Sequence, residues 1–134
     1  MILNLSAQSE YGLMLLKYLA VLPSGATANL RTIANKFELP VKYLEQVGGK
    51  LVKGGIITSR PGKQGGYGMA VNPSRLRLTA ILEVLEPSAP AVCRHNGSCC
   101  KRQSACPNKT GWLKVQQELY KKLSRYKLAD LIAR

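Results

Sequence analysis

The sequence predicts a mainly helical fold with one small β-hairpin, in the order of a winged helix-turn-helix followed by a long C-terminal helix. Three observations predict it. Apolar residues recur at helical spacing in several stretches, a β-branched run precedes a Gly-rich turn, and Pro or Gly separates these segments. The 134 residues are enough for one domain with a core and one dimerisation element, so we do not expect two full domains.

Two helices are predicted in the N-terminal part of the chain. Ser6 can cap the first helix, which stops at Pro23. Asn29 can cap the second, which ends near Glu38. In each helix, apolar residues three and four positions apart predict one buried face. These faces consist of Tyr11, Met14, Leu15, Tyr18, Leu19 and Leu22, and of Leu30, Ile33, Ala34 and Phe37.

A third helix is predicted from Pro40 to the pair Gly54 and Gly55. Proline suits a first helical turn because its missing N–H would have no partner there, and glycine tolerates the left-handed conformation at a helix end. The buried stripe is Leu44, Val47 and Leu51. The opposite face is polar and consists of Lys42, Tyr43, Glu45, Gln46, Lys50 and Lys53. With the second helix, this helix forms a helix-turn-helix.

A β-hairpin and a fourth helix are predicted next. The segment 56–59, with three β-branched residues, and the segment 67–71 can pair as two strands. The turn between them, residues 61–66, is rich in glycine and has a basic tip. After a break at residues 72–74, a helix that ends at Pro87 carries Leu78, Ile81, Leu82 and Leu85.

The last part of the chain is predicted to hold an irregular loop, residues 87–108, and a helix over residues 110–126. A narrow apolar seam at near seven-residue spacing follows this helix. Such a seam fits a partner helix in a homodimer, and packing onto the chain's own domain is the alternative. The residues of the seam are Trp112, Val115, Leu119, Leu123 and Tyr126.

The net charge of +13 predicts a negatively charged partner, either nucleic acid or an anionic membrane surface. No apolar stretch approaches the roughly 18 residues that span a bilayer. The N-terminus has no basic and apolar pattern of a secretion signal. We therefore expect a cytoplasmic protein without a membrane span. Its one histidine, His95, and few carboxylates are poor material for a nucleophile beside a base, so we expect no enzyme.

A helix-turn-helix followed by a basic hairpin predicts a winged helix on double-stranded DNA, with the third helix in the major groove. Lys42 and Gln46 can donate to base edges, and Glu45 can accept from a cytosine amino group. Gly65 and Gly66 let the wing backbone approach DNA closely. RNA binding is the alternative. The expected DNA-contacting residues are Lys42, Tyr43, Glu45, Gln46, Lys50, Arg60, Lys63 and Gln64.

All four cysteines fall in one short segment, at Cys93, Cys99, Cys100 and Cys106. A secreted, disulfide-stapled domain would spread its cysteines along the chain. Zinc prefers cysteine pairs with two to four residues between them, whereas thiolates on a loop can wrap an iron–sulfur cluster at wider spacing. The spacing therefore favours a cluster over zinc. Free thiols or a thiol–disulfide switch without metal are the alternative, and His95 is either a ligand or an exposed side chain.

The sequence resembles the IscR, NsrR and CymR group of bacterial regulators over nearly the whole chain. The resemblance lies in residues 9–13 (SEYGL), 43–46 (YLEQ), 65–67 (GGY), the cysteine loop and residues 128–131 (LADL). It implies a homodimeric winged-helix regulator of transcription. In the IscR and NsrR branches, three cysteines and one further ligand bind an iron–sulfur cluster, and the state of the cluster controls promoter binding.

The resemblance also implies which cysteines bind the cluster. Cys93 and Cys106 match the outer pair of the family pattern. Cys99 and Cys100 compete for the middle position because this loop is one residue longer than the family's. The expected cofactor is an iron–sulfur cluster of the 2Fe–2S type.

The fourth ligand is left open between Glu10 and the extra cysteine. The histidine of the IscR branch is replaced by Lys109, whose ammonium cannot bind iron without losing its proton. Glu10 stands where the NsrR branch takes an acidic ligand from the other subunit. We expect a palindromic operator with half-sites about 34 Å apart. The expected division is 1–86 for DNA binding, 87–109 for a cysteine-rich sensor loop, and 110–134 for the dimerisation helix and C-terminal segment.

Overall fold

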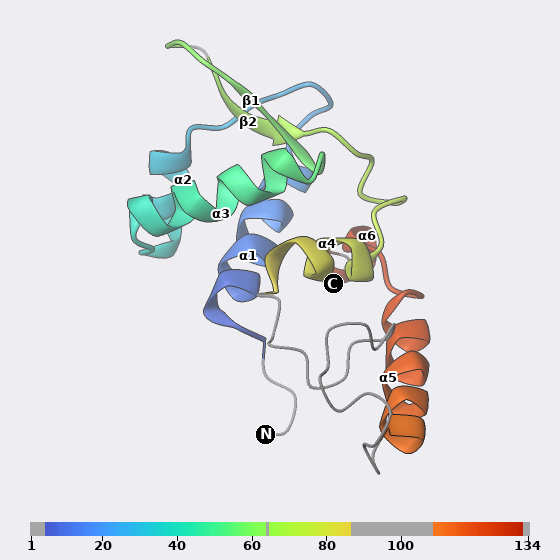
Figure 1. Ribbon diagram of the computed structural model, residues 1–134. Helices are drawn as coiled ribbons and strands as arrows, with labels where there is room; N and C mark the ends of the chain where they lie inside the picture. The colour runs from blue at the N-terminus through green and yellow to red at the C-terminus, as the bar shows by residue number, and fades with distance from the viewer. Residues whose placement is uncertain (1–4, 64, 87–108, 133–134) are drawn as a thin grey trace.

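The structure, a computed structural model, describes residues 5–63, 65–86 and 109–132 (Figure 1). Its elements are α1 (Ala7–Ala20), α2 (Leu30–Phe37), α3 (Val41–Lys53), β1 (Ile57–Arg60), β2 (Gly66–Met69), α4 (Leu78–Leu85), α5 (Lys109–Leu123) and α6 (Leu128–Ile132). The hairpin, α2 and α3 gather at one end of the molecule, and α5 projects at the other (Figure 1). The predicted mainly helical fold with one hairpin is confirmed. Within these ranges, no helix has the length and apolar character of a membrane span.

Helix α1 is the centre of the fold and packs against α3, α4, α6 and β2. Its predicted cap is confirmed, because the Ser6 hydroxyl accepts a hydrogen bond from the Ser9 backbone N–H at 3.2 Å. The prediction of its buried face was wrong in part, because the small residues Ser9 and Gly12 are buried where α1 approaches α4 closely. A Cβ on Gly12 would collide with the Leu85 side chain. The buried residues are Ser9, Gly12, Leu15, Leu16 and Leu19, whereas Tyr11, Met14, Tyr18 and Leu22 are half-buried.

Helices α2 and α3 form the predicted helix-turn-helix. The Asn29 side chain caps α2 by accepting from the Arg31 backbone N–H at 2.7 Å, and Glu38 ends that helix with a left-handed φ of 55°. Pro40 is the N-cap residue of α3, one position before the helical turn in which the sequence placed it. Gly55 follows the helix with the expected left-handed conformation, at φ 75°. The predicted stripe of α3 is buried, at Leu44, Val47 and Leu51.

The wing is joined to the helix-turn-helix by an isolated β-bridge. Strands β1 and β2 pair antiparallel, as predicted. Ala28 pairs with Tyr67 on the other side of β2, the backbone N–H of each donating to the carbonyl of the other at 2.9 Å. The close approach of these two backbones requires glycine at position 66, because a Cβ on Gly66, at φ 145°, would collide with the Ala28 carbonyl oxygen. The bridge was not predicted, and it fixes the hairpin to the residues that enter α2.

The C-terminal segment returns to the core. The predicted helix over residues 110–126 ends earlier than expected, and α6, which was not predicted, follows it. The segment between these helices pairs with the residues before α4. The Leu78 backbone N–H donates to the Tyr126 carbonyl, and the Leu128 N–H donates to the Leu76 carbonyl, both at 2.8 Å. The Leu128 side chain is fully buried, so α6 is part of the core.

The core lies between α1 and the elements around it. Among the side chains that the structure describes, α5 contributes none to it. The helix-turn-helix and the wing therefore belong to the packed part of the fold, and α5 projects from it (Figure 1). The buried apolar residues are Leu15, Leu16, Leu19, Leu30, Ile33, Ala34, Leu44, Val47, Leu51, Ile56, Ile57, Leu76, Ile81, Leu85 and Leu128.

Candidate nucleic-acid interface

Helix α3 presents a continuous polar face to solvent. Its exposed residues recur at intervals of three and four, so they lie along one side of the helix, opposite the buried stripe. Near the middle of this face, a Cβ on Gly49 would meet no heavy atom within 4 Å. A duplex can therefore approach the helix backbone there. The exposed residues are Lys42, Glu45, Gln46, Gly49, Lys50 and Lys53.

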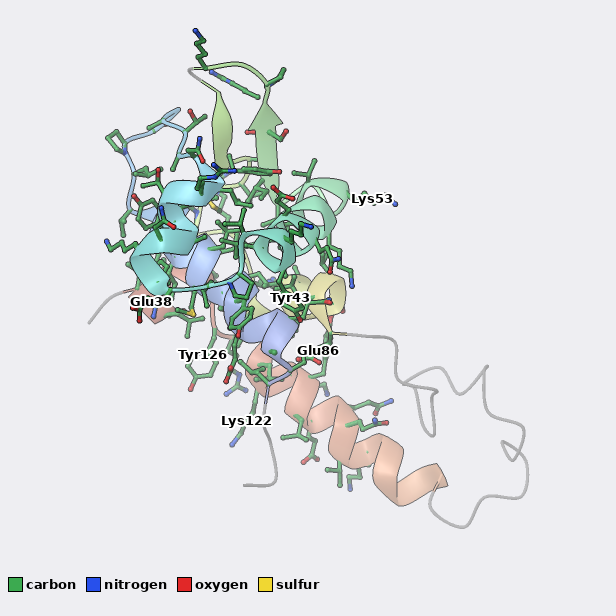
Figure 2. The ribbon with its side chains drawn as sticks, turned by 90° about the vertical axis from the view of Figure 1, so that its left-hand side faces the viewer. Glu38, Tyr43, Lys53, Glu86, Lys122 and Tyr126 are labelled. Carbon is green, nitrogen blue, oxygen red and sulfur yellow. The ribbon has the colours of Figure 1, made fainter. Side chains whose placement is uncertain are left out.

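Tyr43 differs from the other predicted contact residues that the structure describes, because its ring packs partly against the fold. Its ring meets the Tyr11 ring edge to face, with centroids 5.2 Å apart and planes at 88°. The residue is half-buried against the core. Figure 2 shows Tyr43 among the packed side chains, whereas Lys53 extends away from the fold. The sequence pattern missed this distinction because an aromatic residue beside a polar face can belong to either surface.

The wing adds positive charge beside this face. Arg60 at the end of β1 and Lys63 in the turn are exposed. The backbone N–H of Gly65 donates to the Gly62 carbonyl at 3.1 Å and closes the turn. The predicted contact residue Gln64 lies outside the described residues. Between positions 41 and 69 the sequence has Lys or Arg at five positions and a single acidic residue, so α3 and the wing together attract a polyanion.

A polar joint connects α3 to the ends of α1 and α4. Lys50 Nζ donates to Gln8 Oε1 at 3.0 Å, and Gln8 Nε2 donates to the Leu85 carbonyl oxygen. The Glu86 carboxylate accepts from the Ser9 hydroxyl at 2.7 Å. Gln8 and Glu86 were not predicted as functional residues. Their partners are distant in sequence, and no local pattern reveals them.

The predicted cluster ligands lie mostly outside the described residues. All four cysteines and His95 belong to residues 87–108, so the ligand set remains a prediction. Glu10 is exposed in the first turn of α1. In the part of the chain that the structure describes, no three His, Cys, Asp or Glu side chains come close enough to bind a metal ion. Glu10 therefore belongs to no such group among the described residues.

Helix α5 carries exposed apolar side chains along the predicted seam. Val115, Leu119, Leu123 and Tyr126 are 46%, 39%, 37% and 53% exposed. On the side toward α4, the Tyr120 hydroxyl donates to the Glu83 carboxylate at 2.5 Å. This hydrogen bond raises the pKa of Tyr120 above its ordinary value of 10.0. Among the side chains that the structure describes, α5 therefore contacts its own fold through the polar group of Tyr120 and leaves these four seam residues exposed. The side chain of the fifth seam residue, Trp112, lies outside the described side chains.

Comparison with known sequences gives one family and a related curated protein. The family model described as "Rrf2: Iron-dependent Transcriptional regulator" matches residues 5–134. One curated relative is Protein rrf2 of Nitratidesulfovibrio vulgaris, which is 33% identical over 131 residues. The match covers 97% of this chain and 87% of the relative. Both matches extend over the helix-turn-helix, the wing and the C-terminal helices.

Solved structures with the same fold include regulators with different descriptions. CymR of B. subtilis, described as the global cysteine regulator, is 27% identical with a TM-score of 0.74 over 98% of each chain. IscR of T. potens is 30% identical with a TM-score of 0.72, over 98% of this chain and 88% of its own. The winged-helix fold predicted from the sequence is confirmed by this similarity.

Proposed function

Because this chain belongs to the Rrf2 family of transcriptional regulators, we propose that it binds a palindromic DNA operator as a homodimer in the cytoplasm. The observation that carries the proposal is the exposed polar face of α3 beside a basic wing. A helix of 13 residues is about 20 Å long, which suits insertion into the major groove. No catalytic step is part of this function.

On DNA, the residues of this interface take two roles. Gln46 lies exposed on the polar face of α3, where its amide can bind a base edge. Lys53 is exposed at the end of α3, and Arg60 and Lys63 are exposed in the wing, where they neutralise phosphates. Tyr43, packed against Tyr11, orients α3 rather than reading bases.

The exposed seam of α5 supports a homodimer. Apolar side chains at near seven-residue spacing bury themselves best against an identical helix, and a two-fold pair of α5 helices would set two α3 helices on successive half-sites. The proposal assigns residues 1–86 to DNA binding, 87–109 to the sensor loop and 110–134 to the dimerisation helix and C-terminal segment. Within the last segment, α6 also packs on α1.

For the sensor we propose an iron–sulfur cluster bound by the cysteines at 93, 99 or 100, and 106, with Glu10 or the remaining cysteine as fourth ligand. Cysteine thiolates are the usual ligands of iron–sulfur clusters, and Glu10 offers an exposed carboxylate. The family description, iron-dependent, favours this reading. A second candidate is direct thiol oxidation without metal, which the similarity to Staphylococcus aureus CymR, solved in an oxidized form, favours.

A Gln46→Ala variant is expected to lose preference at one base pair of each half-site. The mismatch cost there, about 1–3 kcal/mol in the unchanged protein, should vanish because no side chain reads that base edge. The operator is first selected from a random duplex library, and affinities for its single-base variants are then compared. Lys53→Ala is the control, because it should weaken all sequences alike and lower the salt slope by about one.

Two results would contradict this assignment. If Gln46→Ala keeps the full preference at every position, Gln46 does not read bases. If the unchanged protein selects no duplex sequence and its affinity does not fall with salt, the proposed function is wrong. A preference for RNA competitors at equal salt would assign the same surface to RNA.

Protein purified without oxygen is expected to be brown, with visible absorption bands and matched amounts of iron and acid-labile sulfide. The reason is that thiolate-bound iron–sulfur clusters absorb visible light, whereas free thiols do not. Replacing each cysteine by serine, and Glu10 by alanine, should then identify the ligands by loss of these bands. A colourless protein that cannot be reconstituted with iron and sulfide would contradict the cluster and favour thiol oxidation.

A further inference from the structure

We infer that Gln8 is a positioning residue for DNA binding, whose side-chain amide orders Lys50 on α3 and fixes it to the C-terminal end of α4. The inference rests on the proposed function, because Lys50 acts on DNA only if α3 lies against it. It adds a residue of α1, which lies outside the predicted interface, to those that set DNA affinity.

The amide of Gln8 bridges α3 and α4 through its two ends. Its oxygen accepts from Lys50 Nζ at 3.0 Å, and its nitrogen donates to the Leu85 carbonyl oxygen. An ammonium group only donates and a carbonyl oxygen only accepts, so the two partners determine which way the amide points. An amide that cannot flip is suited to hold Lys50 in one orientation.

Further hydrogen bonds beside Gln8 join the start of α1 to the end of α4. The Glu86 carboxylate accepts from the buried Ser9 hydroxyl at 2.7 Å and from the Ser6 backbone N–H at 3.3 Å. These bonds fix the first turn of α1 to the end of α4, directly beside Gln8. Figure 2 shows Glu86 at this end of α1, below α3. Gln8 therefore connects this contact between α1 and α4 to Lys50 on the polar face of α3.

Lys50 keeps the capacity to bind phosphate while it contacts Gln8. Its ammonium group has three N–H donors, and the contact with Gln8 uses one of them. The side chain is exposed, so its flexible four-carbon stem would otherwise sample many rotamers. Ordering such a side chain only on binding reduces affinity by about two- to tenfold. Gln8 lowers this cost by ordering Lys50 beforehand.

The joint lies next to the cysteine segment in sequence. The chain continues from Glu86 into the residues that include all four cysteines. A displacement of the end of α4 would move the Leu85 carbonyl, the Gln8 amide and the lysine that the amide orders. The joint therefore links the end of α4 to Lys50 on α3 through two hydrogen bonds.

The test is a double-mutant cycle on the full chain with a random-sequence DNA duplex, because a phosphate contact is independent of sequence. Gln8→Met removes both hydrogen bonds and keeps a side chain of similar length. Gln8→Met and Lys50→Ala should each weaken binding by about two- to tenfold. The double variant should match Lys50→Ala alone, since Gln8 acts through Lys50. Thermal unfolding confirms that each variant is folded.

The matched control is Lys53→Ala, which removes the same charge from the same helix. Gln8→Met should weaken the Lys53→Ala protein by the same factor as it weakens the unchanged protein. The inference is overturned if Gln8→Met binds DNA normally, or if it weakens the Lys50→Ala protein by its full factor. Both results leave the proposed function intact, whereas an unchanged protein that does not bind duplex DNA overturns the two together.

Discussion

Replacing Leu119 by glutamate is expected to convert a dimeric protein to a monomer and to weaken operator binding by about 100-fold or more, because a monomer binds one half-site at a time. Leu119 lies between Val115 and Leu123 on the exposed seam of α5. A carboxylate in an apolar helix pair loses its hydration without gaining a partner. Sedimentation at several protein concentrations and titration of the full operator measure the two effects.

The control for this variant is Gln117→Glu, which introduces the same charge on α5. Residue 117 is two positions from Leu119, so it lies on nearly the opposite side of the helix, and it is exposed. This variant should remain dimeric and keep its operator affinity. A dimer of unchanged stability in Leu119→Glu would show that subunits associate through another surface.

Replacing Leu128 by alanine is expected to lower the free energy of unfolding by about 2–5 kcal/mol, as for leucine at the centre of a core. Leu128 has 0% of its surface exposed, and its backbone N–H donates to the Leu76 carbonyl at 2.8 Å. The lost side chain leaves a cavity between α6 and α1 that the surrounding helices fill only in part. Denaturant unfolding at fixed protein concentration measures the loss.

The comparison for Leu128→Ala is Val21→Ala, at a residue that is 64% exposed. The latter should change stability by no more than about 0.5 kcal/mol, since it removes little buried surface. If both variants lower the free energy of unfolding by equally little, α6 does not pack in the core in solution. The contrast therefore tests the part of the fold that the sequence pattern did not predict.

The elements that the sequence predicted correctly depend on neighbouring residues. Ser6 and Asn29 marked the starts of α1 and α2 because a cap is a contact within one turn. The periodic apolar stripes gave α2, α3 and α4. Where burial depends on a distant element, the pattern failed. Ser9 and Gly12 are buried on α1 only because α4 packs there, and a hydrophobic pattern does not register a serine or a glycine.

The same distinction explains what could be predicted of the site. The polar face of α3 was predicted because it is the complement of a buried stripe on the same helix. The contact of Gln8 with Lys50 joins residues 42 positions apart, and its contact with Leu85 joins residues 77 apart. Tyr43 packs on Tyr11 although it follows Lys42 on the same helix. Long-range contacts of single side chains leave no periodic signal.

The central place of α1 has a consequence for how the protein is made. Its apolar face packs on α4 and α6, and Leu128 completes the core. At a synthesis rate of about 5–20 residues per second, the roughly 110 residues between α1 and Leu128 take about 5–20 s to translate. The apolar face of α1 stays incompletely covered during that time, so its burial is completed only after α6 has been synthesised.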